Sequence, residues 1–314
     1  MGGLGRRRWL GAGALGLGAG AAAAWSAYRV SPSFWKNLPA EMQRSVLDPP
    51  HVPDPGQWPD RGLFGAWLGH ATVLMKIDGY TIVTDPVFSN HAGFHFGPVS
   101  LGIKRIVAPA VPIEKLPRVD LIALSHAHMD HLDVPSLRSL EAKSTHVVTA
   151  VETSDLLRVD RYGSVKEMRW GSEWRVGPVR IRAIEVNHWG ARYRTDTYRG
   201  FNGYILEAGR YRVLFAGDTA NTHTFAGLKD RRGFDFAIMP IGAYNPWIRY
   251  HCNPEQAWRM GNEAGADRFI AVHHQTFPLG REPRAEPLSR FLYAAGGAAD
   301  RVVVRAIGQQ FHAS

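Results

Sequence analysis

Residues 125–133, which read Ser-His-Ala-His-Met-Asp-His-Leu-Asp, constrain this chain more than any other segment. They directly follow an apolar run that ends at Leu124 and is typical of a buried strand. Residues two apart on an extended segment point to the same side, so His126 and His128 can converge on one ion. The turn that follows brings Asp130 and His131 to a neighbouring position. Packing does not explain this cluster, whereas imidazole and carboxylate together suit zinc, manganese or iron.

Three further candidate ligands each end a predicted strand. His188 follows the strand 181–186, Asp218 follows 213–215, and His273 follows 269–272. Each is a weak signal alone. Because loops at the carboxyl ends of strands build functional sites, their shared position makes the set convincing.

The rest of the chain predicts an α/β fold, an αββα sandwich with two sheets and helices outside, rather than a doubly wound parallel sheet. Early strands are expected at 65–68, 72–77, 81–84 and 121–124, with Asp78-Gly79 as a tight turn. Later strands are expected near 165–169, 178–186, 202–207, 211–216, 235–240, 268–272 and 301–306. Helices are expected near 134–142, 152–158, 222–228, 254–264 and 286–295.

The His-x-His-x-Asp-His motif, with a later His, Asp and His, resembles the signature of the metallo-β-lactamase superfamily. Flanking strings resemble N-acylphosphatidylethanolamine-hydrolysing phospholipase D: Trp67-Leu68-Gly69-His70-Ala71-Thr72, Thr84-Asp85-Pro86-Val87-Phe88-Ser89, His188-Trp189, Gly217-Asp218-Thr219 and Pro240-Ile241-Gly242-Ala243-Tyr244. The resemblance runs from about Trp67 to His273. It implies the metallo-β-lactamase fold, with two mixed β-sheets flanked by helices.

The resemblance also implies roles for the ligands. One metal would be held by His126, His128 and His188, the second by Asp130, His131 and His273, with Asp218 bridging them. The expected cofactor is a pair of Zn2+ ions, with Mn2+ or Fe2+ as alternatives, and a hydroxide shared by both ions would be the nucleophile. The implied reaction is phospholipase D-type hydrolysis of N-acylphosphatidylethanolamine or a related phospholipid at a membrane surface.

Other residues are predicted to support the reaction. Asp130 is assigned a catalytic role as a charged ligand. His70 either supports the ligands or is a hydrogen-bonded turn residue, and His251 resembles a family histidine near the substrate phosphate. Asp85 and Asp133 are candidates to orient ligand imidazoles, and Asp133 equally fits the N-cap of the helix that begins at Val134.

Aromatic residues and one cysteine accompany the ligand loops. The aromatics, which either line an acyl-chain cleft or simply pack, are Trp189, Tyr193, Tyr198, Tyr244 and Trp247. Cys252 is the only cysteine, and a complete His/Asp set favours an inert thiol over a nucleophile. His274 is expected to point away from its neighbour His273. Around His273 and after His188 the chain departs from the family pattern. Both regions border the expected substrate site, so the resemblance does not determine which lipid is bound.

The amino terminus reads as a targeting segment at 1–30. Arg6-Arg7-Arg8-Trp9-Leu10 precedes an uncharged Gly/Ala/Leu stretch and resembles a twin-arginine export pattern. The segment is either a cleaved signal or a membrane anchor, and the alternative is a buried helix of the domain. The predicted location is the bacterial periplasm or the periplasmic face of the inner membrane. Residues 31–60 are expected to be an extended lead-in to a hydrolase domain at 61–314.

Composition narrows the partners. The net charge of +9 is spread thinly beyond the arginine cluster, which argues against nucleic acid and fits a phospholipid or other phosphodiester substrate. The sequence carries no signal for oligomeric state. Two other functions stay open: a lactonase or small ester or phosphodiester hydrolase of the same fold, and a metal-binding module without turnover.

Overall fold

The computed structural model describes residues 43–97, 99–193 and 195–313. Residues 46–314 form one compact unit. The expected export segment at 1–30 and the first part of the lead-in lie outside the described residues. Before the first sheet, residues 46–62 contain one short 3-10 helix, Pro55–Gln57.

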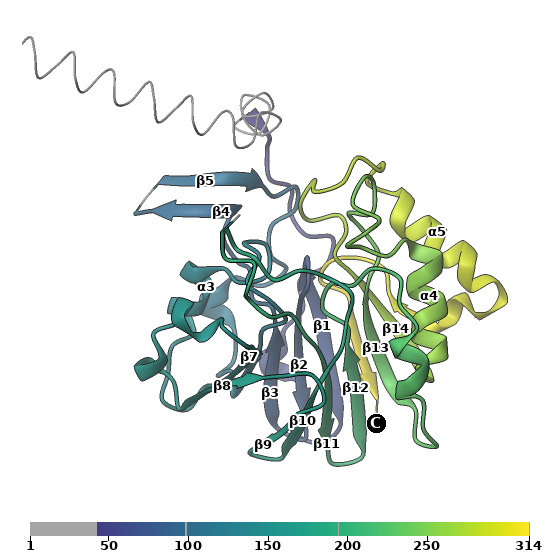
Figure 1. Cartoon of the computed structure of the whole chain (residues 1–314), viewed down its shortest axis with the longest axis horizontal. Helices are drawn as coiled ribbons and strands as arrows, with labels where there is room; N and C mark the ends of the chain where they lie inside the picture. The colour runs from purple at the N-terminus through teal and green to yellow at the C-terminus, as the bar shows by residue number, and fades with distance from the viewer. Residues whose placement is uncertain (1–42, 98, 194, 314) are drawn as a thin grey trace, which may run out of the picture. The chain divides into compact units, whose positions relative to one another are not determined.

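The first sheet has seven strands in the order β16-β1-β2-β3-β6-β7-β8 (Figure 1). Its strands are β1 (Leu63–Gly69), β2 (Thr72–Ile77), β3 (Tyr80–Thr84), β6 (Leu121–Ala123), β7 (His146–Ala150), β8 (Ser164–Met168) and β16 (Gln310–Ala313). From β16 to β3 neighbours pair antiparallel, and from β3 to β8 they pair parallel. The expected turn at Asp78-Gly79 joins β2 to β3, and both residues have positive φ.

The second sheet repeats this plan in the order β15-β14-β13-β12-β11-β10-β9. Its strands are β9 (Glu173–Val176), β10 (Val179–Ile184), β11 (Gly203–Ala208), β12 (Tyr211–Phe215), β13 (Phe234–Pro240), β14 (Ala266–Val272) and β15 (Val302–Val304). The strands from β9 to β12 pair antiparallel, and those from β12 to β15 pair parallel. The predicted two-sheet architecture is therefore confirmed.

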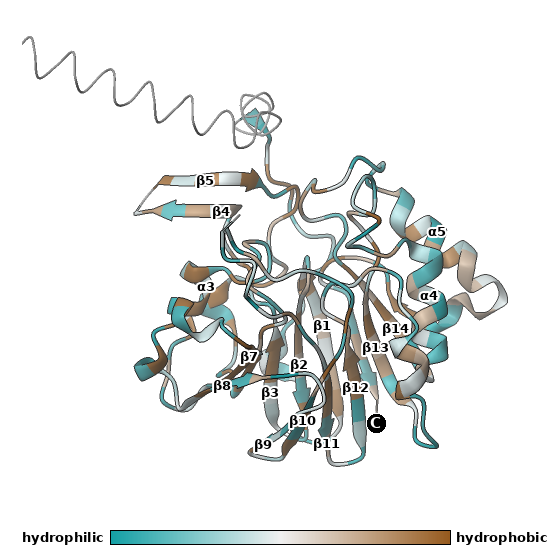
Figure 2. Cartoon of the chain, viewed as in Figure 1, coloured by the Kyte–Doolittle hydropathy of each residue, from teal (hydrophilic) through white to brown (hydrophobic). Residues whose placement is uncertain are grey.

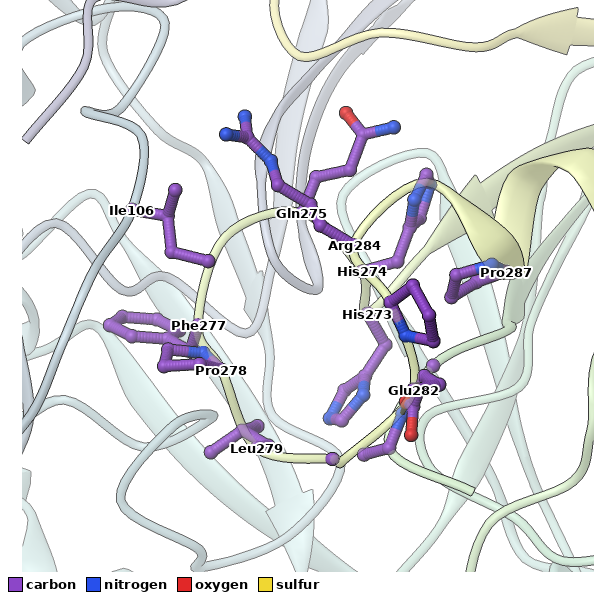
Figure 3. Close-up of a pocket in the computed structure, with 14 residues that line it drawn as sticks. Ile106, His273, His274, Gln275, Phe277, Pro278, Leu279, Glu282, Arg284 and Pro287 are labelled. Carbon is purple, nitrogen blue, oxygen red and sulfur yellow. Dashed lines mark hydrogen bonds between the residues drawn. The ribbon is translucent and has the colours of Figure 1, made fainter. Parts of the chain in front are cut away.

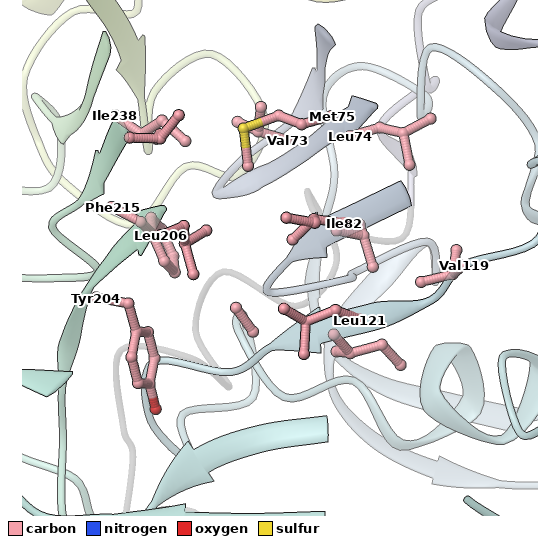
Figure 4. Close-up of a cluster of buried hydrophobic side chains, with 14 of the residues drawn as sticks. Val73, Leu74, Met75, Ile82, Val119, Leu121, Tyr204, Leu206, Phe215 and Ile238 are labelled. Atoms are coloured by element: carbon pink, nitrogen blue, oxygen red, sulfur yellow. The ribbon is translucent and has the colours of Figure 1, made fainter. Parts of the chain in front are cut away.

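Apolar side chains fill the space between the two sheets. In Figure 4, Ile82 and Leu121 from the first sheet face Leu206, Phe215 and Tyr204 from the second. All five are fully buried. A buried side chain of this size contributes about 1.5–3 kcal/mol relative to an exposed one, so this layer is the main source of stability.

Two helices cover the outer face of the second sheet: α4 (Pro254–Glu263) and α5 (Glu286–Ala295). Their apolar sides pack on β14, where Trp258 and Phe291 contact the ring of Phe269. Figure 2 shows hydrophilic and hydrophobic residues interspersed along both helices. On the first sheet, α3 (Val134–Ser139) adds Leu137 to the core. In the described part of the chain, the helices that flank the two sheets are thus α3, α4 and α5.

Several predicted elements differ from the structure. The expected helices at 152–158 and 222–228 are short 3-10 helices, Ser154–Leu156 followed by Val159–Arg161, and Thr224–Leu228. Further 3-10 helices are Ile113–Lys115 and Gly296–Arg301. The sequence did not predict β7, β9 or β16, nor the hairpin formed by β4 (His91–Phe96) and β5 (Val99–Lys104). β7, β9 and β16 are short, and glycine and histidine interrupt the hairpin strands, which weakens the strand pattern.

The hairpin β4–β5 is a separate two-stranded sheet that projects beyond the two main sheets (Figure 1). Within the described part of the chain, no helix is long and apolar enough to span a bilayer.

Candidate metal centre

The candidate site lies where strands of both sheets end. The β1–β2 turn and the loops after β3 and β6 of the first sheet meet loops after β10, β12, β13 and β14 of the second. These loops bring together all seven predicted ligands, together with His70, Asp85 and His251. The predicted ligands are His126, His128, Asp130, His131, His188, Asp218 and His273. The position at strand ends, inferred from the sequence, is the position observed.

A first group consists of three imidazoles. Nε2 of His126 lies 2.7 Å from Nδ1 of His128, which lies 3.2 Å from Nε2 of His188. One ring nitrogen of each residue falls within 4.8 Å of the others. Three convergent imidazole nitrogens are donors that can hold a transition-metal ion.

A second group combines imidazoles with a carboxylate. Oδ2 of Asp130 lies 3.4 Å from Nε2 of both His131 and His273, and 2.8 Å from Nε2 of His70. His273 reaches this position because the chain turns after β14, where its φ is 63°. His70 also has positive φ, 51°, in the turn between β1 and β2.

Asp218 lies between the two groups. Its Oδ2 is 3.1 Å from Nε2 of both His131 and His273, and 3.8 Å from Nε2 of His188. Asp218 therefore lies near imidazoles of both groups. A carboxylate in this place can serve two ions at once.

Buried polar atoms in the centre fit bound metal. Both oxygens of Asp218 and the Nε2 atoms of His128, His131 and His273 are buried, with no hydrogen bond satisfying them in the described part of the chain. Buried polar atoms nearly always have partners, so this cluster of bare nitrogens and oxygens needs an explanation. Divalent ions would satisfy all of them, and the mixed imidazole and carboxylate donors suit zinc, manganese or iron.

The three histidines of the first group favour the neutral form of the imidazole ring. Burial holds the pKa of His126 and of His188 well below the usual range and lowers the pKa of His128 to about 4. Since a metal binds the unprotonated ring, these residues require no proton release near neutral pH.

The second group has the opposite electrostatics. Burial alone would lower the pKa of His131 and His273, but the nearby carboxylates outweigh it. Asp218 and Asp130 hold the pKa of His131 well above its usual range and raise that of His273 to about 9. The field at this position is negative and favours a cation.

Asp85 orients one ligand, as the sequence predicts. Its Oδ2 lies 2.6 Å from Nδ1 of His131, so the other ring nitrogen is directed into the centre. Ser125 holds the same carboxylate through its backbone N–H at 2.7 Å and its hydroxyl at 2.5 Å. The hydroxyl also lies 2.8 Å from Nδ1 of His126. Sequence reasoning missed Ser125, although it directly precedes the first ligand.

Asp133 occupies the predicted N-cap position of α3, although its side chain makes no capping bond to the helix backbone. It accepts hydrogen bonds from Ser89 and from the hydroxyl of Ser136, and lies 3.2 Å from Nε2 of His95 on β4. The carboxylate therefore ties the ligand loop to the hairpin and to the loop after β3.

Arg192 and Tyr250 were also missed. Nη1 of Arg192 donates to the carbonyls of Ala127 and Leu132 at 3.0 and 2.8 Å, which holds the ligand loop from outside. Nδ1 of His188 lies 2.8 Å from the carbonyl of Tyr250. Only folding brings these partners together, so no local pattern predicts them.

His251 lies beside the centre, with Nδ1 3.7 Å from Oδ2 of Asp218. Both residues line a cavity of about 330 Å³ that opens above the ligands. Trp189, Trp247 and Leu279 contribute apolar surface to it. The predicted aromatic lining is thus correct for the two tryptophans.

The other predicted aromatics lie elsewhere. Tyr193 stacks on Phe94 of the hairpin. Tyr244 is buried and donates to Glu286. Tyr198 lines a different depression, beside Trp170. For Tyr198 and Tyr244 the lining interpretation is wrong, because neither side chain lines the cavity beside the metal centre.

Two neighbouring residues behave as the sequence predicts. Figure 3 shows the rings of His273 and His274 pointing in opposite directions at a second cavity, of about 180 Å³. His274 stacks on Trp67. Cys252 is buried, its thiol lies 3.3 Å from the carbonyl of Pro240, and burial raises its pKa. This environment is that of a structural cysteine, in agreement with the expectation of an inert thiol.

Comparison with known proteins gives named relatives. An uncharacterised protein of Mycobacterium tuberculosis is 31% identical over 73% of this chain, and the chain spans only 63% of that relative's length. N-acyl-phosphatidylethanolamine-hydrolyzing phospholipase D 1 of Caenorhabditis elegans is 32% identical over 78% of this chain and 73% of its own length.

A solved structure supports the fold. A possible metal-dependent hydrolase from Veillonella parvula has a TM-score of 0.64 at 17% identity, covering 81% of this chain and all of its own length. Residues 80–274 match the family described as the Beta-lactamase superfamily domain. The chain therefore belongs to the metallo-β-lactamase superfamily of metal-dependent hydrolases.

Proposed function

We propose that this enzyme is a dinuclear zinc phosphodiesterase of the phospholipase D type that hydrolyses N-acylphosphatidylethanolamine or a related phospholipid. The observation that carries the proposal is the pairing of two ligand groups around Asp218 beneath an apolar-walled cavity. The name of the Caenorhabditis elegans relative supports the substrate class.

The reaction adds water across the bond between phosphorus and the N-acylethanolamine oxygen. Phosphatidic acid keeps the phosphate, and N-acylethanolamine leaves with a proton. Two divalent ions, when bound, supply hydroxide near neutral pH and offset the phosphate charge. His126, His128 and His188 would hold one ion, and Asp130, His131 and His273 the other, with Asp218 shared.

The remaining side chains position the substrate and the ligands. His251 faces the cavity and can donate a hydrogen bond to a phosphoryl oxygen. His70 holds Asp130 at 2.8 Å, and Asp85 holds His131 at 2.6 Å. Trp189 and Trp247 shield the cavity from water and present apolar surface to an acyl chain.

The test is product analysis with N-acylphosphatidylethanolamine, together with the metal content of the purified protein. Phosphatidic acid and N-acylethanolamine, with about two zinc ions bound, are the expected results. Two bound ions without lipid cleavage would contradict the proposed substrate. Two bound manganese or iron ions with full lipid cleavage would contradict only the proposed identity of the metal.

A second candidate is hydrolysis of a lactone or another small ester or phosphodiester. The cavity volume of about 330 Å³ favours it, because this value lies at the lower end for small-molecule sites. Turnover of small esters without turnover of diacyl lipid would support this candidate over the first.

We also propose that the protein acts on the periplasmic side of a bacterial inner membrane. The support is the sequence pattern around Arg6 and Arg7. Replacing both by lysine should block delivery to the periplasm, measured by cell fractionation. Unchanged delivery would show that the twin-arginine route is not used.

A further inference from the structure

The hairpin β4–β5 has one apolar face. Its register pairs Phe94 with Leu101 and Phe96 with Val99, so these four side chains share a face. Their exposed fractions are 44%, 37%, 61% and 55%. Large apolar side chains that are exposed side by side often mark a site that binds another molecule, whereas single exposed apolar residues are ordinary.

The same face is covered nearer the body of the protein. Ala92 pairs with Ile103, and both pack with Val87 and Phe277. The opposite face is polar, and His95 on it contacts Ser100 and Asp133. The hairpin is therefore anchored at its base, whereas its outer apolar half projects from the body (Figures 1 and 2). A two-stranded ribbon is marginally stable alone, so further contacts to this face would stabilise it.

Aromatic side chains extend this face to the mouth of the catalytic cavity. The ring of Phe94 stacks on Tyr193, with centroids 6.0 Å apart. Trp189 and Tyr250 lie 5.7 Å apart, and both line the cavity. Trp247, also at the cavity, is 51% exposed. Ile103, on the apolar face of the hairpin, lines the same cavity, so this face reaches the entrance.

The charge of this surface is neutral to positive. Residues 91–104 and 246–251 contain no Asp or Glu, and the second segment includes Arg249. Tryptophan and tyrosine favour the boundary between lipid headgroups and acyl chains, and basic residues are attracted to anionic headgroups. These properties match an anionic bilayer.

We propose that the outer half of the β4–β5 hairpin, with the aromatic rim, docks this enzyme on an anionic lipid bilayer and directs the cavity toward it. The inference rests on the proposed lipid substrate. A bilayer fits better than a second copy of the chain, because a second copy on this surface would cover the entrance that substrate must use.

A fluorescent label on the hairpin of the full chain tests the docking. Cys252 is buried, so the introduced thiol of Phe96→Cys is the reactive one for an environment-sensitive dye. Vesicles of phosphatidylethanolamine and phosphatidylglycerol should shift the dye emission to shorter wavelength. The matched label at Tyr293→Cys, on the 86% exposed residue of α5, should not shift. A Phe96→Cys label that stays in water while the protein binds vesicles would overturn the proposal.

A double variant separates docking from catalysis. Phe96→Ser with Val99→Ser should lower hydrolysis of N-acylphosphatidylethanolamine in anionic vesicles about tenfold, since two apolar anchors are lost. Hydrolysis of the same lipid in detergent micelles should stay within about twofold. Equal loss in both would overturn the docking role.

Two further outcomes distinguish the alternatives. A wild-type enzyme inactive on this lipid in either form would contradict the proposed function, while the dye shift would still decide the docking. A wild-type dimer that the double variant converts to monomer, measured by sedimentation, would assign the surface to self-association and overturn the proposal.

Discussion

At the scale of single residues, the centre depends on a few buried carboxylates among many imidazoles. Asp218 contacts His131, His188 and His273, and Asp130 contacts His70, His131 and His273. Each carboxylate brings a full negative charge to a site with low solvent access. Removing one charge therefore affects the site more than removing any one neutral ring would.

Asp130→Asn should leave the fold intact and lower kcat/KM by at least about a hundredfold, because one metal position loses its charged ligand. The amide keeps nearly the same volume, so circular dichroism should not change. Metal content and kcat/KM are measured together. The exposed variant Asp267→Asn is the matched control and should behave as wild type. Wild-type activity with full metal content in Asp130→Asn would contradict the two-metal assignment.

Asp85→Asn tests a carboxylate that contacts a ligand rather than the proposed ion. The amide binds Nδ1 of His131 more weakly, so metal affinity or activity should fall about 10–100-fold. Competition with a zinc-sensitive dye measures the affinity. An unchanged affinity would show that packing alone holds the ring of His131.

At the scale of elements, the chain builds its site by ending strands at polar residues. β6 is apolar and buried, β12 and β14 end in buried apolar residues, and each strand is followed within a few residues by a predicted ligand. Their patterns could be predicted from the sequence because burial on both sides demands continuous apolar runs. The hairpin β4–β5 could not, because its Gly, His and Pro residues read as a loop and only its base packs on the protein.

Helix α4 offers a prediction at this scale. Its start at Asn253-Pro254 was expected, and the structure shows a reciprocal capping box between Asn253 and Gln256 at 2.9 and 3.0 Å. Asn253→Ala should lower the free energy of unfolding by about 1 kcal/mol. Urea unfolding in the presence of a chelator measures this without interference from metal binding. Asn253→Ser, which can still cap, should recover most of the loss, and equal losses in both variants would contradict a capping effect.

At the scale of the whole molecule, the site is shared between two sheets. His126, Asp130 and His131 follow a strand of the first sheet, and Asp218 and His273 follow strands of the second. The sequence predicted these residues from a motif and from strand ends. It could not predict Arg192 or the carbonyl of Tyr250, because their contacts span about sixty residues of chain. Local motifs identify the candidate ligands, whereas the residues that surround the ligands are determined by contacts between distant parts of the chain.

Because the ligands come from both sheets, bound metal should stabilise the whole fold. An ion that binds only the folded state adds about 2.7 kcal/mol at a free concentration one hundred times its Kd. Chelator treatment should therefore lower Tm, and added zinc should restore it. The restoration should be smaller in Asp218→Asn, which loses the carboxylate between the two groups, and unchanged in Asp267→Asn. Differential scanning calorimetry at fixed protein and metal concentrations measures these differences. A Tm that does not respond to zinc in the wild type would mean that the two sheets are held together by their apolar core alone.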